Sequence, residues 1–201
     1  VRSSFTNWQP GYATGVVAAQ KGHKRAMTIT WNYAAGAEAV KGFAEGFEKG
    51  GGKVLKDLNV PFPNVEFQAL LTEIAAQKPD VVFAFFAGGG AVKFVKDYAA
   101  AGLNKTVPLM GSGFLTDGTL EAQGAAAQGL LTALHYADNL ETPRNNAFRK
   151  AYALTYKANA DVYAVQGYDA AQILGAGLLA AKGDLAKRDV ITAAMRKVTV
   201  D

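Results

Sequence analysis

Three contiguous glycines, at 88–90, directly follow the aromatic-rich apolar run "FAFFA" at 83–87. Glycines between a strand and a helix let backbone N–H groups approach an anion closely, so phosphate binding is the first chemistry to test. A P-loop requires Lys followed by Ser or Thr, whereas Lys93 is followed by Phe94. A dinucleotide fingerprint spaces its glycines apart. The glycines therefore indicate a turn at the carboxyl end of a strand, where open α/β sheets place their ligand crevices.

The sequence contains no residue pattern typical of catalysis or metal binding. It has no cysteine, which excludes disulfides, thiolate metal sites and cysteine nucleophiles. Its two histidines, His23 and His135, are far apart and suggest neither a metal site nor a catalytic triad. There is no Gly-x-Ser-x-Gly elbow. We therefore expect no catalytic residue, no metal and no cofactor, and we do not expect an enzyme.

The composition indicates a globular chain with a sizeable core. Half of the 201 residues are hydrophobic and the formal net charge is +4. The densest basic cluster, "KGHKR" at 21–25, is better explained as a loop before a strand than as a nucleic-acid surface. No apolar run approaches the roughly 20 residues of a membrane span. The chain begins with "VRSSF" as though in mid-strand, so we expect a piece of a longer protein.

Short apolar runs and helical patterns alternate from residue 26 onward. Strands are expected at 26–31, 53–60, 80–86, 106–113 and 129–136, and helices between them at 37–49, 67–74 and 91–101. The run at 80–86 is almost continuously apolar, which is typical of a strand covered on both faces. Such alternation predicts parallel βαβ units and an open, doubly wound α/β sheet.

The pattern becomes helical after residue 136. Thr142 is a candidate N-cap with Pro143 at the first helical position, and further helices are expected at about 163–182 and 187–197. No strong strand lies between them. We therefore expect these helices to pack on a sheet supplied by sequence outside this chain, after a crossing between domains near 136–140.

Several stretches together resemble a known family. They include "VRSSFTNWQPGYATG", "TITWNYAAGAEAVKGFAEGFEKGGGKVL", "PDVVFAFFAGGGAVKFVKDYAAAGL", "PLMGSGF", "EAQGAAAQGLLTALHY" and "DVYAVQGYDAAQIL". In this order they are similar to the type I periplasmic solute-binding proteins of ABC importers, in the branch of the branched-chain amino-acid binders. The resemblance implies two doubly wound lobes that close on a small ligand by hinge motion. Residues 1–5 would finish a crossing, 6–135 would form one nearly complete lobe, and 138–201 would be the helical part of the other.

The resemblance also implies where a ligand would lie, at the carboxyl ends of the strands. In the amino-acid binders of the family, acidic side chains meet the ligand ammonium at the places that Asn7 and Gly113 occupy here. Neither residue is charged. A buried ammonium without a counter-ion costs several kcal/mol, so an amino-acid ligand is disfavoured.

Aromatic residues replace the missing charges near the expected strand ends. Trp8, Tyr33, Phe86 and Phe114 are candidate ligand-binding residues, since aromatic walls suit a flat ligand. Strand alternation allows only one of Phe85 and Phe86 to face a ligand, and we expect Phe86. Members of the family with similar stretches import aromatic carboxylates such as benzoate or hydroxycinnamate relatives.

The carboxylate of such a ligand needs donors on the chain. Backbone N–H groups at Ala87, Gly88 and the following glycines are expected to bind it.

Some of these residues have structural alternatives. Asn7 could cap a helix that starts near Pro10, and Phe114 could lie in the core. Tyr168 and Asp169, in "QGYDAAQ", are expected to have structural roles.

The resemblance and the residues together predict the extracytoplasmic binding component of an ABC importer. We expect a periplasmic monomer that binds a small aromatic carboxylate, delivers it to an inner-membrane permease and binds no nucleic acid. A branched-chain amino-acid binder, or a ligand-sensing domain of a receptor or regulator with the same fold, remains an alternative.

Overall fold

The computed structural model describes residues 1–199, which divide into two compact units. The larger unit, residues 6–135, contains a sheet and its covering helices. The smaller unit combines residues 1–5 with the chain from Tyr136 onward and is helical.

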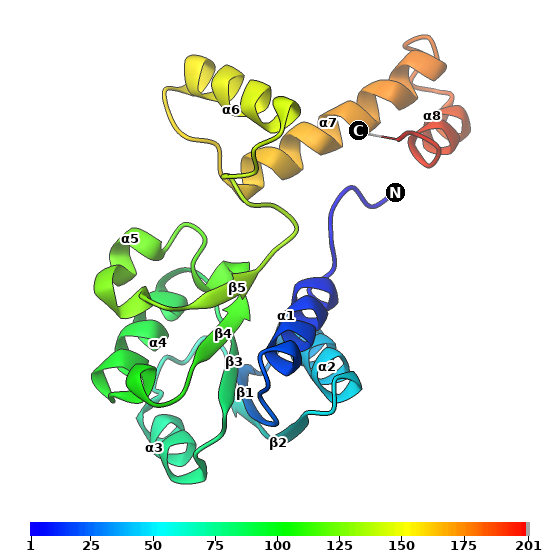
Figure 1. Cartoon of the computed structure of the whole chain (residues 1–201). Coiled ribbons are helices and arrows are strands. Elements are labelled where there is room, and N and C mark those ends of the chain that lie inside the picture. Colours follow the sequence, from blue (N-terminus) through cyan, green and yellow to red (C-terminus); the bar gives the residue numbers. More distant parts are fainter. Residues whose placement is uncertain (200–201) are drawn as a thin grey trace. The chain divides into compact units, whose positions relative to one another are not determined.

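A five-stranded parallel sheet forms the centre of the larger unit (Figure 1). The strand order is β2-β1-β3-β4-β5. The strands are β1 (Arg25–Trp31), β2 (Lys53–Val60), β3 (Val81–Phe85), β4 (Leu109–Ser112) and β5 (Leu131–Ala133). The parallel, doubly wound α/β class expected from the alternation is confirmed.

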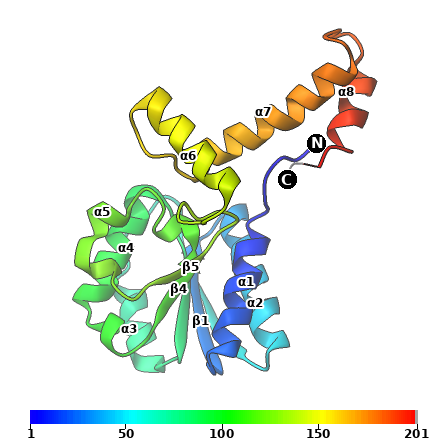
Figure 2. The ribbon, with the colours of Figure 1, turned by 45° about the horizontal axis from the view of Figure 1, so that its top comes forward.

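Helices cover both faces of this sheet. Helices α1 and α2 lie on one face, and α3, α4 and α5 lie on the other (Figure 2). Their bounds are α1 (Trp8–Gln20), α2 (Ala34–Lys49), α3 (Gln68–Gln77), α4 (Gly88–Ala100) and α5 (Leu120–Gln123), with 3-10 turns η1 (Leu103–Lys105), η2 (Gly113–Leu115) and η3 (Gly124–Ala127). In the described part of the chain, no helix is both long and apolar enough to cross a bilayer.

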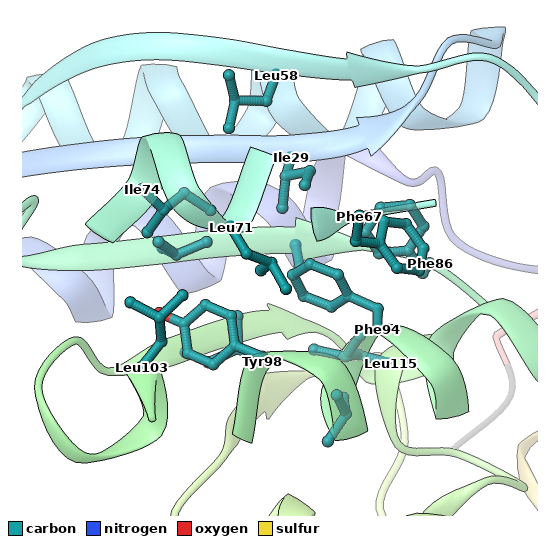
Figure 3. Close-up of a cluster of buried hydrophobic side chains, with 14 of the residues drawn as sticks. Ile29, Leu58, Phe67, Leu71, Ile74, Phe86, Phe94, Tyr98, Leu103 and Leu115 are labelled. Carbon is teal, nitrogen blue, oxygen red and sulfur yellow. The ribbon is translucent and has the colours of Figure 1, made fainter. Parts of the chain in front are cut away.

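The larger of two buried clusters fills the space between the sheet and helices α3 and α4. Figure 3 shows side chains from β1, β2, α3, α4 and the adjoining loops meeting there. Phe67, Phe86 and Phe94 pack with ring centroids 4.8 to 5.2 Å apart. Each fully buried ring of this size contributes roughly 1.5–3 kcal/mol to stability. Tyr98 is also buried, and its hydroxyl donates to the carbonyl of Val107 at 3.0 Å.

Helices α1 and α2 approach each other closely because glycines line their contact. A Cβ atom on Gly15 of α1 would lie 2.2 Å from the carbonyl oxygen of Phe43 on α2. A Cβ atom on Gly42 of α2 would lie 2.2 Å from the carbonyl oxygen of Trp8. Any side chain at either position would force the two backbones apart, so the position of α1 against the sheet depends on these glycines.

The basic cluster at 21–25 has a structural explanation. The guanidinium of Arg25 donates to the carbonyls of Gln77 and Lys78 at 3.0 and 3.2 Å, so it neutralises the end of α3. Asp80 accepts from the backbone N–H groups of Lys24 and Arg25 at 2.8 Å each. These contacts fasten the start of β1 to the turn before β3.

Several elements differ in length from the sequence prediction. Strand β4 starts at Leu109 and not at 106, because the N–H of Val107 turns back to the carbonyl of Leu103. Strand β5 ends at Ala133, before the predicted 136. Helix α4 begins at Gly88 and not at 91, so the three glycines form the first turn of the helix.

The smaller unit consists of helices α6 (Pro143–Tyr156), α7 (Val162–Ala180) and α8 (Arg188–Met195). The predicted N-terminus of α6 is confirmed, since Thr142 Oγ1 accepts from the N–H of Asn145 at 3.2 Å and Pro143 opens the helix. Arg144 on α6 donates to Gln172 on α7 at 2.8 Å.

Candidate ligand-binding site

Four aromatic rings form a row along the carboxyl edge of the sheet. Phe114 follows β4, Phe85 ends β3, Tyr33 follows β1 and Phe62 follows β2. The ring centroids of successive members are 6.2 Å apart from Phe114 to Phe85, 6.2 Å from Phe85 to Tyr33 and 5.5 Å from Tyr33 to Phe62. We call these four residues the aromatic row. Phe62 is exposed, and Tyr33 and Phe114 are partly exposed. Phe85 is buried and joins Phe114 to Tyr33. The partly exposed rings can pack against a flat ligand at the edge where parallel sheets bind ligands.

Tyr33 occupies the middle of the aromatic row. It immediately precedes α2 with an extended backbone, and its ring stacks on Phe62 with an interplanar angle of 22°. The side chain is half-buried, and this burial raises the pKa of the Tyr33 phenol. The phenol is therefore protonated at neutral pH and can donate a hydrogen bond.

The structure corrects the choice between Phe85 and Phe86. Phe86 is 0% exposed and packs in the core against Trp31, Phe67 and Phe94. Phe85 is 3% exposed but points to the other face, where it meets Tyr33 and Phe114. Since side chains alternate along the strand, Phe85 and not the expected Phe86 belongs to the row.

Gly88 and Gly89 form a helix start that is open to solvent, whereas Gly90 is buried against Trp31. Ala87 precedes α4 in an extended conformation and gives it no side-chain cap. Gly88 has a φ of +54°, and there is empty space where Cβ atoms would stand at Gly88 and Gly89. The first N–H groups of a helix have no partner within the helix and carry partial positive charge. This helix start can therefore accept a carboxylate.

A second uncapped helix start lies at the same edge of the sheet. Helix α2 follows β1, which is the neighbour of β3, and Tyr33 gives α2 no side-chain cap. The two helix starts and the aromatic row supply anion-binding and ring-binding groups without any catalytic group.

Gly113 and Asn7 are the two uncharged positions at which the family resemblance implied acidic residues in amino-acid binders. Gly113 is buried, and a Cβ atom there would lie 2.6 Å from the Cβ of Leu134, so a larger side chain has no room. Asn7 precedes α1 but its side chain does not cap the helix. Instead, its N–H donates to Oε2 of Glu38 at 3.2 Å. Glu38 is thus a carboxylate beside Asn7 that the sequence analysis missed. One of its oxygens already accepts the hydrogen bond from the N–H of Asn7.

The side chain of Trp8 contacts residues of helices α1 and α2. Its ring stacks on Tyr12 with centroids 4.7 Å apart, and its Nε1 donates to Oε2 of Glu45 at 2.8 Å. Both partners belong to the pair of helices α1 and α2. The rings of Tyr33 and Phe114 both meet Phe85, whereas the side-chain contacts of Trp8 are with α1 and α2.

Tyr168 and Asp169 lie in the helical unit, along a hollow of about 380 Å³ that Tyr136 and Phe148 also line. The ring of Tyr168 packs on Phe148 with centroids 4.8 Å apart. This contact joins α7 to α6, as a structural role requires.

The chain matches one protein family over its full length. Residues 1–201 match the family described as periplasmic binding protein. This chain belongs to the periplasmic binding protein family. Its doubly wound parallel sheet is the type I form of that fold.

Solved structures of ABC-transporter solute-binding proteins are similar to this periplasmic binding protein. One, from R. palustris in complex with benzoate, is 52% identical with a TM-score of 0.92, covering 99% of this chain and 55% of that chain. Another, from Rhodopseudomonas palustris BisB5 in complex with 3,4-dihydroxybenzoic acid, is 34% identical with a TM-score of 0.86, covering 96% of this chain and 54% of that chain.

Another relative is named for a different class of ligand. The Leu/Ile/Val-binding protein homolog 6 of Brucella melitensis is 33% identical over 151 residues, which cover 74% of this chain and 39% of that protein. The periplasmic binding protein described here thus spans about half the length of the solved chains that it matches, and less of this relative.

Two members of the site were not selected from the sequence. Phe62 follows β2 between two prolines. An aromatic residue in the motif "VPFP", directly after a predicted strand, could have indicated it as a site residue. Glu38 gave no signal, because its contact with Asn7 depends on how α1 and α2 pack.

Proposed function

We propose that this chain forms the ligand-binding part of an extracytoplasmic solute-binding component of an ABC importer, with a small aromatic carboxylate as its ligand. The ligand ring packs on the aromatic row, and its carboxylate accepts hydrogen bonds from the backbone at Ala87, Gly88 and the following glycines. The protein performs no chemistry. It acts in the periplasm as a monomer and delivers the ligand to an inner-membrane permease.

The aromatic row beside an uncapped helix start is the observation that carries this proposal. Rings in edge or stacked contact add about 0.5–1.5 kcal/mol per pair beyond the area that they bury. A helix start binds an anion through backbone N–H groups and needs no cationic side chain. The benzoate and dihydroxybenzoate complexes of similar proteins support the same ligand class.

The absence of acidic residues at two positions supports an anionic ligand over an amino acid. Asn7 is neutral, and Leu134 fills the space beside Gly113. An ammonium placed at Gly113 would lose its hydration without gaining a counter-ion from that position. The proposed contact residues are Tyr33, Ala87, Gly88 and Phe114, with Phe85 replacing Phe86; Asn7, Trp8 and Gly113 border the site.

A branched-chain amino acid is the second candidate ligand. The similarity to the Leu/Ile/Val-binding protein homolog from Brucella melitensis favours it. Glu38, which lies beside Asn7, is the carboxylate that could then serve as counter-ion.

Thermal unfolding of the full-length protein with a panel of ligands decides between the two. The panel contains benzoate, 4-hydroxycinnamate, leucine and valine. A ligand present at 100 times its Kd stabilises the folded state by about 2.7 kcal/mol. We expect the aromatic acids to raise the Tm and the amino acids to leave it unchanged. A shift with leucine or valine but none with the aromatic acids would overturn the proposal.

A further inference from the structure

Phe62 exposes an aromatic ring at the outer end of the aromatic row. The side chain is 59% exposed, although its ring stacks on Tyr33 and meets Trp31 edge-on with centroids 5.3 Å apart. Among residues 6–135, all of which the structure describes, only Phe62 and Leu120 are large hydrophobic residues with such exposure. A single exposed ring beside a ligand site is too small for a protein-docking patch and suits a small molecule.

The loop that carries Phe62 is fixed in place. Pro61 and Pro63 restrict the backbone on both sides of it. The carbonyl of Asn64 accepts from Nε1 of Trp31 at 2.8 Å. The backbone N–H of Asn64 donates to the carbonyl of Pro61 at 2.7 Å. The ring is therefore held in position before any ligand arrives, which lowers the entropy cost of contact with a ligand.

The position of Phe62 sets how far a ligand must reach. The proposed carboxylate site at the start of α4 follows β3, whereas Phe62 follows β2, and β1 lies between these two strands. Two strand spacings amount to about 10 Å. A benzoate, with its carboxylate directly on the ring, is shorter than this distance. An aromatic acid with a spacer between its carboxylate and its ring is long enough.

We propose that Phe62 is a specificity-determining residue that packs against the part of the ligand farthest from the carboxylate and favours phenylpropenoid-length acids over benzoates. This inference rests on the proposed function and adds the length of the ligand to it. The ring of Phe62 stacks on the distal ring or its para substituent, with Tyr33 behind it.

Calorimetric titration of the full-length protein with benzoate and 4-hydroxycinnamate tests this inference. We expect Phe62→Ala to raise the Kd for 4-hydroxycinnamate at least tenfold and that for benzoate less than threefold. Phe62→Leu keeps apolar volume but removes the ring, and should produce an intermediate loss. Leu120→Ala is the matched control, since Leu120 is 57% exposed elsewhere in the same unit, and should change neither Kd.

Each outcome separates this inference from the proposed function. If wild-type protein binds benzoate but not 4-hydroxycinnamate, or if Phe62→Ala leaves the ratio of the two Kd values unchanged, the role of Phe62 is overturned while the proposed function stands. If wild-type protein binds neither acid, the proposed function itself fails. Phe62→Ala also removes the ring contacts with Tyr33 and Trp31, so we expect a lower Tm without ligand than in wild type, and the ratio of the two Kd values separates this loss from ligand contact.

Discussion

Trp8 on α1 is bonded through its indole Nε1 to Oε2 of Glu45 on α2, at 2.8 Å. The ring also stacks on Tyr12, one turn further along α1. The most prominent aromatic residue of the N-terminal stretch therefore joins two helices, although its sequence position suggested a ligand contact.

The Trp8→Phe variant should lose stability but keep its ligand. Phenylalanine retains a ring against Tyr12 but cannot donate to Glu45, so we expect a loss of about 1 kcal/mol in the free energy of unfolding. The Kd for benzoate should change less than threefold. Urea unfolding and calorimetry of the same protein measure both quantities. A Kd for benzoate that is tenfold weaker, with unchanged stability, would show that Trp8 contacts the ligand.

The Gly15→Ala variant should be strongly destabilised. The new Cβ would lie 2.2 Å from the carbonyl oxygen of Phe43, and overpacking of this kind costs about 1–3 kcal/mol. Gly175→Ala is the matched control, because Gly175 lies in α7 with open space around it. There the exchange should be neutral or stabilising by up to about 1 kcal/mol. Equal effects of the two exchanges on the urea midpoint would contradict the close contact of α1 and α2.

The Glu38→Gln variant tests the electrostatic basis of the proposed ligand class. The variant keeps an acceptor for the N–H of Asn7 but removes a negative charge near the start of α1, which should cost about 0.3–1 kcal/mol of stability. Affinity for benzoate should not fall, since an anion gains nothing from Glu38. If the wild-type protein binds leucine and this exchange abolishes that binding, Glu38 is an ammonium counter-ion and the aromatic-acid proposal is wrong.

The central strand β3 could be predicted from the sequence because it is apolar and buried on both faces. The run at 80–86 and the helical stripe formed by Phe67, Leu71 and Ile74 are set by local periodicity, and the structure confirms both elements with small changes at their ends. The glycines at 88–90 were expected to precede a helix. Glycine is a weak helix former, so propensity could not show that the helix begins with them.

The details of the site depend on tertiary contacts that the periodicity of the sequence cannot predict. Alternation allowed one of Phe85 and Phe86 to face the ligand edge, but which one depends on which face of β3 carries α1 and α2. The role of Phe62 requires knowing that β2 lies beside β1, since only then does its ring reach Tyr33. Leu134 beside Gly113 is likewise a contact between neighbouring strand ends.

Asp80 should make the stability of the protein depend on pH in the acidic range. Hydrogen bonds from the backbone N–H of Lys24 and of Arg25, with the nearby positive charge of Arg25, lower the pKa of the Asp80 carboxyl. A carboxyl with a lowered pKa in the folded state stabilises above its unfolded pKa, near 4, and loses this contribution as the pH falls through the folded value. Asp80→Asn should therefore be less stable than wild type at pH 7, with the difference shrinking below pH about 4. Urea unfolding of both proteins from pH 2 to 7 measures this. A difference between their urea midpoints that stays constant over this range would contradict the prediction.

Tyr33 should contribute its ring, and not its charge, to ligand binding. Removing the ring in Tyr33→Ala interrupts the aromatic row between Phe85 and Phe62, and we expect the Kd for benzoate to rise roughly tenfold, about 1.4 kcal/mol. Tyr33→Phe keeps the stacked ring and should change the Kd for benzoate less than threefold. Because burial raises the pKa of the Tyr33 phenol above its usual value near 10, the group stays neutral up to about pH 9 and does not repel a carboxylate. Calorimetry at pH 7 and pH 9 should give the same benzoate affinity in wild type. A loss of affinity at pH 9 that Tyr33→Phe removes would mean that the phenol ionises beside the ligand, contrary to its burial in the row.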